Sequence, residues 1–143
     1  MAHNSLMQAR TRFSFMKQIF TLLAAFMLFS AFAVKSMSGL DDVINSLRTG
    51  NATELAKYVD DNIEISLPDK SNSYSRAQAI VILQDFFTTN GVKNFVVTHK
   101  GDNKGSQFCI GTLQTRSGNY RTTVFMKTKN GRQLVKEIRF QAS

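Results

Sequence analysis

Few residues of this chain have the type and spacing that ligand binding or catalysis needs, and most of them lie in its second half. Glu137 and Arg139 are two positions apart in a stretch with strand periodicity, so their side chains share one face. If that face is concave, the two residues line a pocket; otherwise they form lateral ion pairs with neighbours such as Arg121 or Lys127. Together with Tyr120, Arg121 belongs to the preceding strand-like stretch. We take Glu137, Arg139, Arg121 and Tyr120 as candidate ligand-binding residues.

Histidine and cysteine offer little further chemistry. His99 has no carboxylate or cysteine at metal-ligand spacing, so it is either a hydrogen-bonded surface residue or a general base in a pocket, and it joins the candidates. Cys109, the single cysteine, lies between Phe108 and Ile110, which is typical of a buried thiol and excludes a disulfide within the chain. We predict no metal site and no catalytic residue.

Other motifs point to structure and not to chemistry. Asp60, Asp61 and Asn62 could bind a cation through their oxygen atoms, but three polar residues between a helix and a strand more simply form a turn. The sequence also contains no glycine-rich phosphate loop, CxxC, HExxH or GxSxG. These absences lower the expectation of an enzyme without removing it, and no cofactor is predicted.

The N-terminal segment has the organisation of a secretory signal peptide. Arg10, Arg12 and Lys17 precede an uncharged run over residues 19–34 (IFTLLAAFMLFSAFAV), and Ala31-Phe32-Ala33 supplies the small-x-small pattern that signal peptidase recognises. As a helix this run reaches about 24 Å, which is short of the roughly 30 Å hydrocarbon core. Cleavage is therefore expected rather than permanent anchoring.

We accordingly divide the chain into a signal peptide over residues 1–35, cleaved after Ala33, and a single domain over residues 36–143. Residues 1–15 are interpreted as an over-extended gene start, because the segment from Met16 onward resembles an ordinary signal sequence. The product is expected to be periplasmic or extracellular and to contact the membrane only transiently, through the signal peptide.

The charge is unevenly distributed. The chain contains 18 Lys and Arg and 10 Asp and Glu. Residues 34–90 hold five basic and eight acidic residues, whereas residues 91–143 hold ten basic and two acidic residues. Basic residues interleaved with aromatic ones suit single-stranded nucleic acid, yet an exported protein rarely meets it. We therefore predict no nucleic acid, and instead a small ligand, an anionic surface or an envelope protein as partner. Basic residues on strands also discourage edge-to-edge aggregation.

Three helices are predicted ahead of a β-rich second half. Apolar residues recur with helical spacing over residues 40–47, Asn51 caps a second short helix, and Ser75 with Gln78 caps the longest helix, over about residues 76–89.

Strand periodicity appears on both sides of the longest helix. Residues 63–67 form a short strand, which Pro68 and the polar residues 69–73 break into a loop. After the helix, four antiparallel strands are predicted at about residues 94–100, 107–115, 120–128 and 133–141. On the last strand one face carries Leu134, Ile138 and Phe140, and the other carries Val135, Glu137, Arg139 and Gln141.

This order of elements resembles the nuclear transport factor 2-like cone. The amino-acid sequence is similar to those of a family of secreted bacterial proteins called domain of unknown function 4783. The resemblance covers about residues 38–141. Its matching stretches are residues 63–73 (IEISLPDKSNS), 74–75 with the helix through 86–87, 99–101 (HKG), 107–112 (QFCIGT), 120–121 (YR) and 137–140 (EIRF). It implies an α+β fold, with N-terminal helices packed on a curved antiparallel sheet that ends in a four-strand meander. The family has no established activity.

Two noncatalytic functions fit these observations. The leading one is an exported module that binds a small apolar or anionic ligand within the cone, or presents its sheet to a protein partner. The second is a structural homodimer, seeded by an outward-facing Val135 together with Phe125 or Val124.

A third hypothesis is a pocket enzyme of isomerase or hydrolase type. Enzymes of this fold that resemble ketosteroid isomerase need an interior carboxylate base and a tyrosine or protonated acid as donor. Glu137 with Tyr74 or Tyr120 supplies the residue types only, and His99 is the alternative base. Nothing in the sequence places these residues together.

Overall fold

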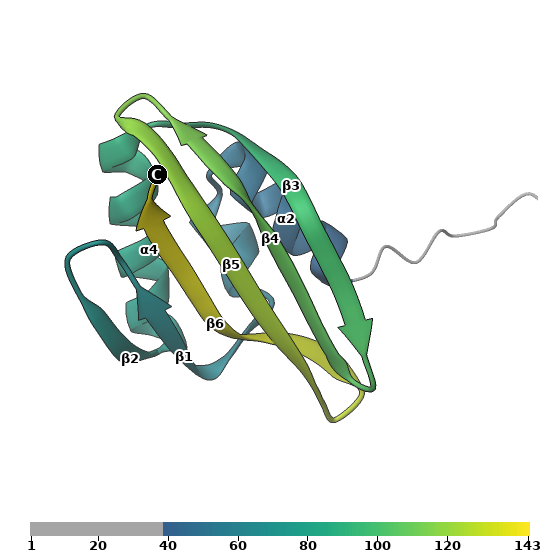
Figure 1. Cartoon of the computed structure of the whole chain (residues 1–143). Helices are drawn as coiled ribbons and strands as arrows, with labels where there is room; N and C mark the ends of the chain where they lie inside the picture. The colour runs from purple at the N-terminus through teal and green to yellow at the C-terminus, as the bar shows by residue number, and fades with distance from the viewer. Residues whose placement is uncertain (1–38) are drawn as a thin grey trace, which may run out of the picture. The chain divides into compact units, whose positions relative to one another are not determined.

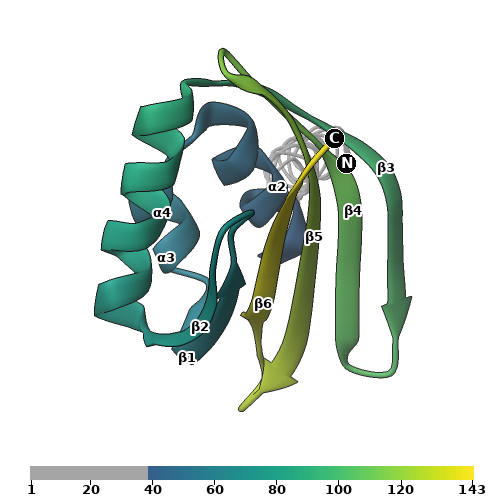
Figure 2. The same ribbon diagram turned by 60° about the vertical axis from the view of Figure 1, so that its left-hand side comes forward.

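The helices cover one face of a curved sheet (Figures 1 and 2). The computed structural model describes residues 39–143, so the predicted signal peptide and its cleavage site lie outside the described residues. The elements follow in the order α2 (Gly39–Thr49), α3 (Ala52–Ala56), β1 (Val59–Ser66), β2 (Ser71–Ser75), α4 (Arg76–Asn90), β3 (Val92–Asn103), β4 (Ser106–Thr115), β5 (Gly118–Lys129) and β6 (Arg132–Ala142). Within residues 39–143 no helix is both long and apolar enough to cross a membrane.

All three predicted helices are present, and two of the predicted caps form. The Asn51 side chain accepts a hydrogen bond from the Glu54 amide, which satisfies a free N–H at the start of α3. The Ser75 and Gln78 capping box opens α4, and Gly91 closes it in the left-handed conformation that glycine adopts without strain. These caps fix where α4 begins and ends between β2 and β3.

The six strands form one sheet in the order β2-β1-β6-β5-β4-β3. The predicted meander of β3 to β6 is confirmed, with every neighbouring pair antiparallel. Strand β1 lies beside the last strand, β6, and this pair is parallel. The expected α+β fold is therefore correct, and the parallel pair is the addition that the sequence pattern did not show.

Two predictions about the first strand were wrong. Residues 69–73 were expected to be a loop, but only Asp69 and Lys70 lie in the connection, and residues 71–75 form β2, which pairs antiparallel with β1. Alternating apolar residues are absent from β2 because most of its side chains are exposed on both faces. The expected turn at Asp60-Asp61-Asn62 is also part of a strand, since β1 begins at Val59.

A β-bulge in β6 changes the faces that alternation predicts. Glu137 pairs with Phe125 and Val135 pairs with Met126, so Lys136 is the extra residue. Val135 consequently lies fully buried in the core and not beside Glu137 as predicted. Val124 is likewise fully buried, so neither valine can seed an interface.

The core lies between the helices and the inner face of the sheet. Phe86 and Phe87 of α4 pack against Phe140 of β6, with ring centroids 4.6 and 6.1 Å from that of Phe140. Leu47 of α2 and Leu113 of β4 are fully buried in the same cluster. The interior of the curved sheet is thus filled with aromatic and aliphatic side chains on the α4 side.

Candidate functional site

The face of the sheet turned away from the helices, here called the outer face, carries most of the predicted site residues. Register places Glu137, Phe125, Phe108 and Gly101 in one row across β6, β5, β4 and β3. The next row contains Arg139, Thr123, Ile110 and His99. Because side chains in a row of paired residues share a face, and Arg121 lies two residues from Thr123 on β5, four of the five candidates lie on the outer face: Glu137, Arg139, His99 and Arg121.

The charged part of the outer face lies on β6 and its two neighbours. Arg139 Nη2 donates a hydrogen bond to Glu137 Oε1 at 2.8 Å, so the two residues pair with each other and not with Arg121 or Lys127 as predicted. Arg121 is exposed and pairs in register with Gln141, one row beyond Arg139. Glu64 of β1 lies beside Glu137. The outer face therefore gathers both signs of charge at β1, β6 and β5.

An apolar patch, formed by Val96, Phe108, Ile110 and Phe125, occupies the outer face on β3, β4 and β5. Val96 is 43% exposed and Phe108 is 39% exposed, whereas Ile110 and Phe125 are half-buried. The Phe108 ring lies over Gly101, where a Cβ atom would stand 2.5 Å from Phe108 Cε1. The absence of a side chain at Gly101 thus leaves room for the Phe108 ring.

Tyr120 lies on the opposite, inner face. Its hydroxyl donates to Asn90 Oδ1 at 2.9 Å, and its ring meets Phe86 edge-on at a centroid distance of 5.2 Å. Asn90 Oδ1 also accepts from Ser117 Oγ at 2.5 Å. These contacts tie the end of α4 to β5, so Tyr120 is separated from Glu137 by the sheet.

His99 is exposed and stands apart from the other candidates. Arg139 shares its row, but β5 and β4 lie between them, which corresponds to about 14 Å at the usual strand spacing. The structure therefore brings Glu137 and Arg139 into contact, places Arg121 one row beyond Arg139 on the neighbouring strand, and leaves His99 and Tyr120 apart from this pair.

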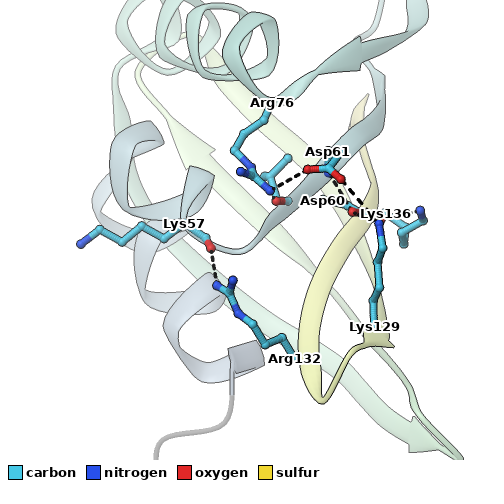
Figure 3. Close-up of polar contacts among 8 residues, drawn as sticks. Lys57, Asp60, Asp61, Arg76, Lys129, Arg132 and Lys136 are labelled. Carbon is cyan, nitrogen blue, oxygen red and sulfur yellow. Dashed lines mark hydrogen bonds and ion pairs between the residues drawn. The ribbon is translucent and has the colours of Figure 1, made fainter.

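Asp60, which was expected to be part of a turn, has a buried carboxylate at the centre of an ion cluster (Figure 3). The Asp60 side chain is 3% exposed and accepts hydrogen bonds from Lys136 Nζ at 2.6 Å and Lys129 Nζ at 3.1 Å. The Asp61 amide donates to Asp60 Oδ1 at 2.7 Å. The hydrogen bond from Lys136, with those from the Asp61 amide and Lys129, holds the pKa of Asp60 well below its usual range.

The same cluster fixes the start of β1. Arg76 Nε donates to the Val59 carbonyl at 3.0 Å, and Arg76 Nη2 donates to Asp61 Oδ1 at 3.2 Å. The β1–β6 pairing is irregular between Val59 and Glu64, opposite the bulge at Lys136. No periodicity in the sequence signals this site, because a bulge removes the alternation on which a strand is recognised.

Two shallow hollows of about 380 Å³ each open on the surface of the described residues. One lies between the β1–β2 turn and the end of β6 and includes Arg139 in its lining. The other lies at the start of α2 and the β5–β6 turn, beside Tyr58 and Arg132. The first hollow places a predicted ligand-binding residue at a concave surface.

Cys109 confirms the prediction of a buried thiol. It is fully buried in the inner face of β4, and burial raises its pKa to about 11. Among residues 39–143 no group of three or more His, Cys, Asp or Glu side chains is placed to hold a metal ion.

Comparison with known proteins identifies both sequence and fold relatives. The family model for a domain of unknown function (DUF4783) matches residues 40–141. A DUF4783 family protein from Bacteroides uniformis is 29% identical, with a TM-score of 0.72 over 74% of this chain and 98% of that chain. One from Bacteroides ovatus is 34% identical, with a TM-score of 0.69 over 71% and 93%.

The fold extends to more distant proteins. An NTF2-like protein of unknown function from Cytophaga hutchinsonii is 11% identical, with a TM-score of 0.55 over 77% of this chain and 95% of that chain. This likeness shows the fold alone, that of nuclear transport factor 2. No match was found among curated proteins.

Proposed function

The chain belongs to the DUF4783 family and has the nuclear transport factor 2-like fold, and from this premise we propose that it is a noncatalytic interaction module that pairs with a second copy of itself through the outer face of its sheet. The observation that carries the proposal is the apolar patch. Of the three exposed large hydrophobic residues among residues 39–143, two belong to this patch, and the third, Val81, is on α4. Exposed apolar patches are typical of interaction sites.

The distribution of charge around the patch favours a second copy as the occupant. A patch on a twofold axis meets its own image, so it must be complementary to itself. The apolar residues satisfy this condition at the centre, and Glu137 with Arg139 provides both signs of charge at the rim. A hydrophobic centre with a polar rim is the usual anatomy of a protein interface.

The interior of the fold supports a noncatalytic role. An isomerase-type site would need a carboxylate and a tyrosine on the inner face. Glu137 is on the outer face and bonded to Arg139, whereas Tyr74 and Tyr120 pack against the core. The rings of Phe86, Phe87 and Phe140 fill the space in which a ligand of the cone would lie.

Self-association is tested by light scattering after gel filtration of the protein purified from the periplasm of a host that exports the full chain. We expect a dimer for the wild type and a monomer for Phe108→Glu, because a charge cannot enter the apolar centre of the interface without a partner. Val81→Glu is the matched control, since it makes the same exposed change on α4 and leaves the dimer intact.

Two outcomes would contradict the proposal. One is a wild-type monomer up to millimolar concentration; the other is a Phe108→Glu protein that remains dimeric. If the wild-type monomer instead retains an envelope protein that Phe108→Glu releases, the outer face serves a different partner and the homodimer is wrong.

We also propose that the module acts outside the cytoplasm, in the periplasm or beyond. The support is the basic start, the uncharged run over residues 19–34 and the small residues at Ala31 and Ala33. Intact-mass measurement of the secreted protein is expected to place its N-terminus at Val34. Retention of the full chain in the cytoplasm would contradict export.

A further inference from the structure

The sheet loses a strand at the hollow beside Arg139. Strand β1 pairs with β6 only as far as Ser66, whose partner is Arg139, while β6 continues to Ala142. Beyond this point the chain turns away through Leu67 and Pro68. The hollow of about 380 Å³ fills the vacated position, and its lining is Ser66, Leu67, Pro68, Arg139, Phe140, Gln141 and Ala142.

The backbone of β6 presents hydrogen-bonding groups to this hollow. The Ser143 amide donates to the Asn119 carbonyl and so points toward β5. Because successive N–H groups of a strand point to alternate edges, the Ala142 amide and the Phe140 carbonyl point the other way. No strand among residues 39–143 lies beside them on that edge. Phe140 lines the hollow although the residue is only 1% exposed. This agrees with its backbone, and not its buried ring, forming the wall of the hollow.

Arg139 adds a charge to the same hollow. Its guanidinium has five N–H donors, and within the described part of the chain Glu137 is its one side-chain partner. The remaining donors have the fork geometry that binds a carboxylate through two parallel hydrogen bonds. An incoming carboxylate would therefore compete with Glu137 for Arg139.

We infer that this hollow binds the C-terminal end of an extended peptide, which pairs with the free edge of β6 and places its terminal carboxylate on Arg139. Addition of a peptide to an open sheet edge is an established mode of recognition, in which main-chain hydrogen bonds supply affinity and neighbouring side chains supply selectivity. The inference does not require self-association, because the apolar patch is on β3, β4 and β5 and the hollow lies on the far side of β6; Arg139, at the rim of the patch, is the residue that the two surfaces share.

The test is NMR titration of the isotope-labelled exported protein with acetyl-Thr-Val-Thr-Val, as the free acid and as the C-terminal amide. We expect the acid to shift the Gln141 and Ala142 amide signals and to bind about tenfold more tightly than the amide, the effect of a charge-assisted pair. Arg139→Gln is expected to remove this preference. Arg48→Gln is the matched control, because it removes the same charge from an exposed position on α2, away from the hollow.

Glu137→Gln provides a test in the opposite direction. It removes the internal competitor of the ligand carboxylate, so the acid is expected to bind about threefold more tightly than to wild type, a modest part of one charge-assisted hydrogen bond. If Arg139 only stabilised the fold, Glu137→Gln would not increase the affinity for the free-acid peptide. Equal binding of acid and amide, unshifted Gln141 and Ala142 signals, or an unchanged preference in a folded Arg139→Gln protein would overturn the inference.

Discussion

The ammonium group of Lys136 donates a hydrogen bond to the buried carboxylate of Asp60 at 2.6 Å, and this contact joins two strands at the point where both are irregular. The bulge in β6 frees Lys136 from the alternation of its strand, and the irregular start of β1 brings Asp60 to it. Bulges re-aim side chains in this way. A buried charge is tolerated when it is paired and hydrogen-bonded, which is the condition that Lys136, Lys129 and the Asp61 amide provide.

Asp60→Asn is expected to destabilise the protein by about 1–3 kcal/mol, because it weakens two charge-assisted hydrogen bonds at a buried position. The free energy of unfolding by urea measures the loss. Asp61→Asn is the matched control: its carboxylate is 73% exposed, so its ion pairs with Arg76 and Lys129 are screened by water and its removal should cost much less. If both variants lost the same free energy of unfolding, the buried ion pairs of Asp60 would contribute no more to stability than the exposed ones of Asp61.

The stability of the wild type should fall in acid. The folded-state pKa of Asp60 is lowered, so its contribution is fully present above the pKa of about 3.9 that an unfolded aspartate has, and is lost as the pH falls toward the folded value. Urea midpoints at pH 7, 5 and 3 should therefore show a difference between wild type and Asp60→Asn that narrows in acid. A difference that stays constant over this range would contradict the assignment.

The Cys109 thiol should be inert in the folded protein. It is fully buried and its pKa is raised to about 11, so little thiolate is present at neutral pH. We expect reaction with an aromatic disulfide reagent to be at least about a hundredfold slower than in urea, because the thiolate is the reactive species and the folded sheet shields it. Rapid stoichiometric labelling under native conditions would show that β4 opens readily.

Tyr120→Phe distinguishes a structural tyrosine from a ligand-binding one. The hydroxyl donates to Asn90 at 2.9 Å, and its removal is expected to lower the free energy of unfolding by about 0.5–1.5 kcal/mol, the usual net value of such a bond. Binding of the test peptide should be unchanged. A variant of full stability that lost binding would restore Tyr120 to the site.

The elements that the sequence predicted correctly are those with strong local signals. The Ser75 and Gln78 capping box, the Asn51 cap and the last four strands all form as expected. The same holds for Cys109, whose apolar neighbours predicted burial. In each case the information lies within a few residues, where local propensity decides the structure.

The features that the sequence did not predict depend on distant or irregular pairing. Strand β2 is too polar to show alternation and forms because β1 lies beside it. The burial of Val135 follows from one extra residue, since a shift of one position exchanges the two faces of a strand. Asp60 could not be recognised because its partners Lys129 and Lys136 are remote in sequence. The spacing of Glu137 and Arg139 on one strand correctly predicted that they share a face, but not that they pair with each other.

The parallel pairing of β1 with β6 has a consequence for the order in which the molecule assembles. Asp60 and Lys136 are 76 positions apart, and β6 is the last strand of the chain. Closing so long a segment costs conformational entropy that only the finished contacts repay, and folds dominated by such distant contacts form slowly. A chain delivered with its N-terminus first therefore carries β1 without its neighbour until nearly every residue has emerged. The six-stranded sheet can therefore close only after β6 has become available to β1.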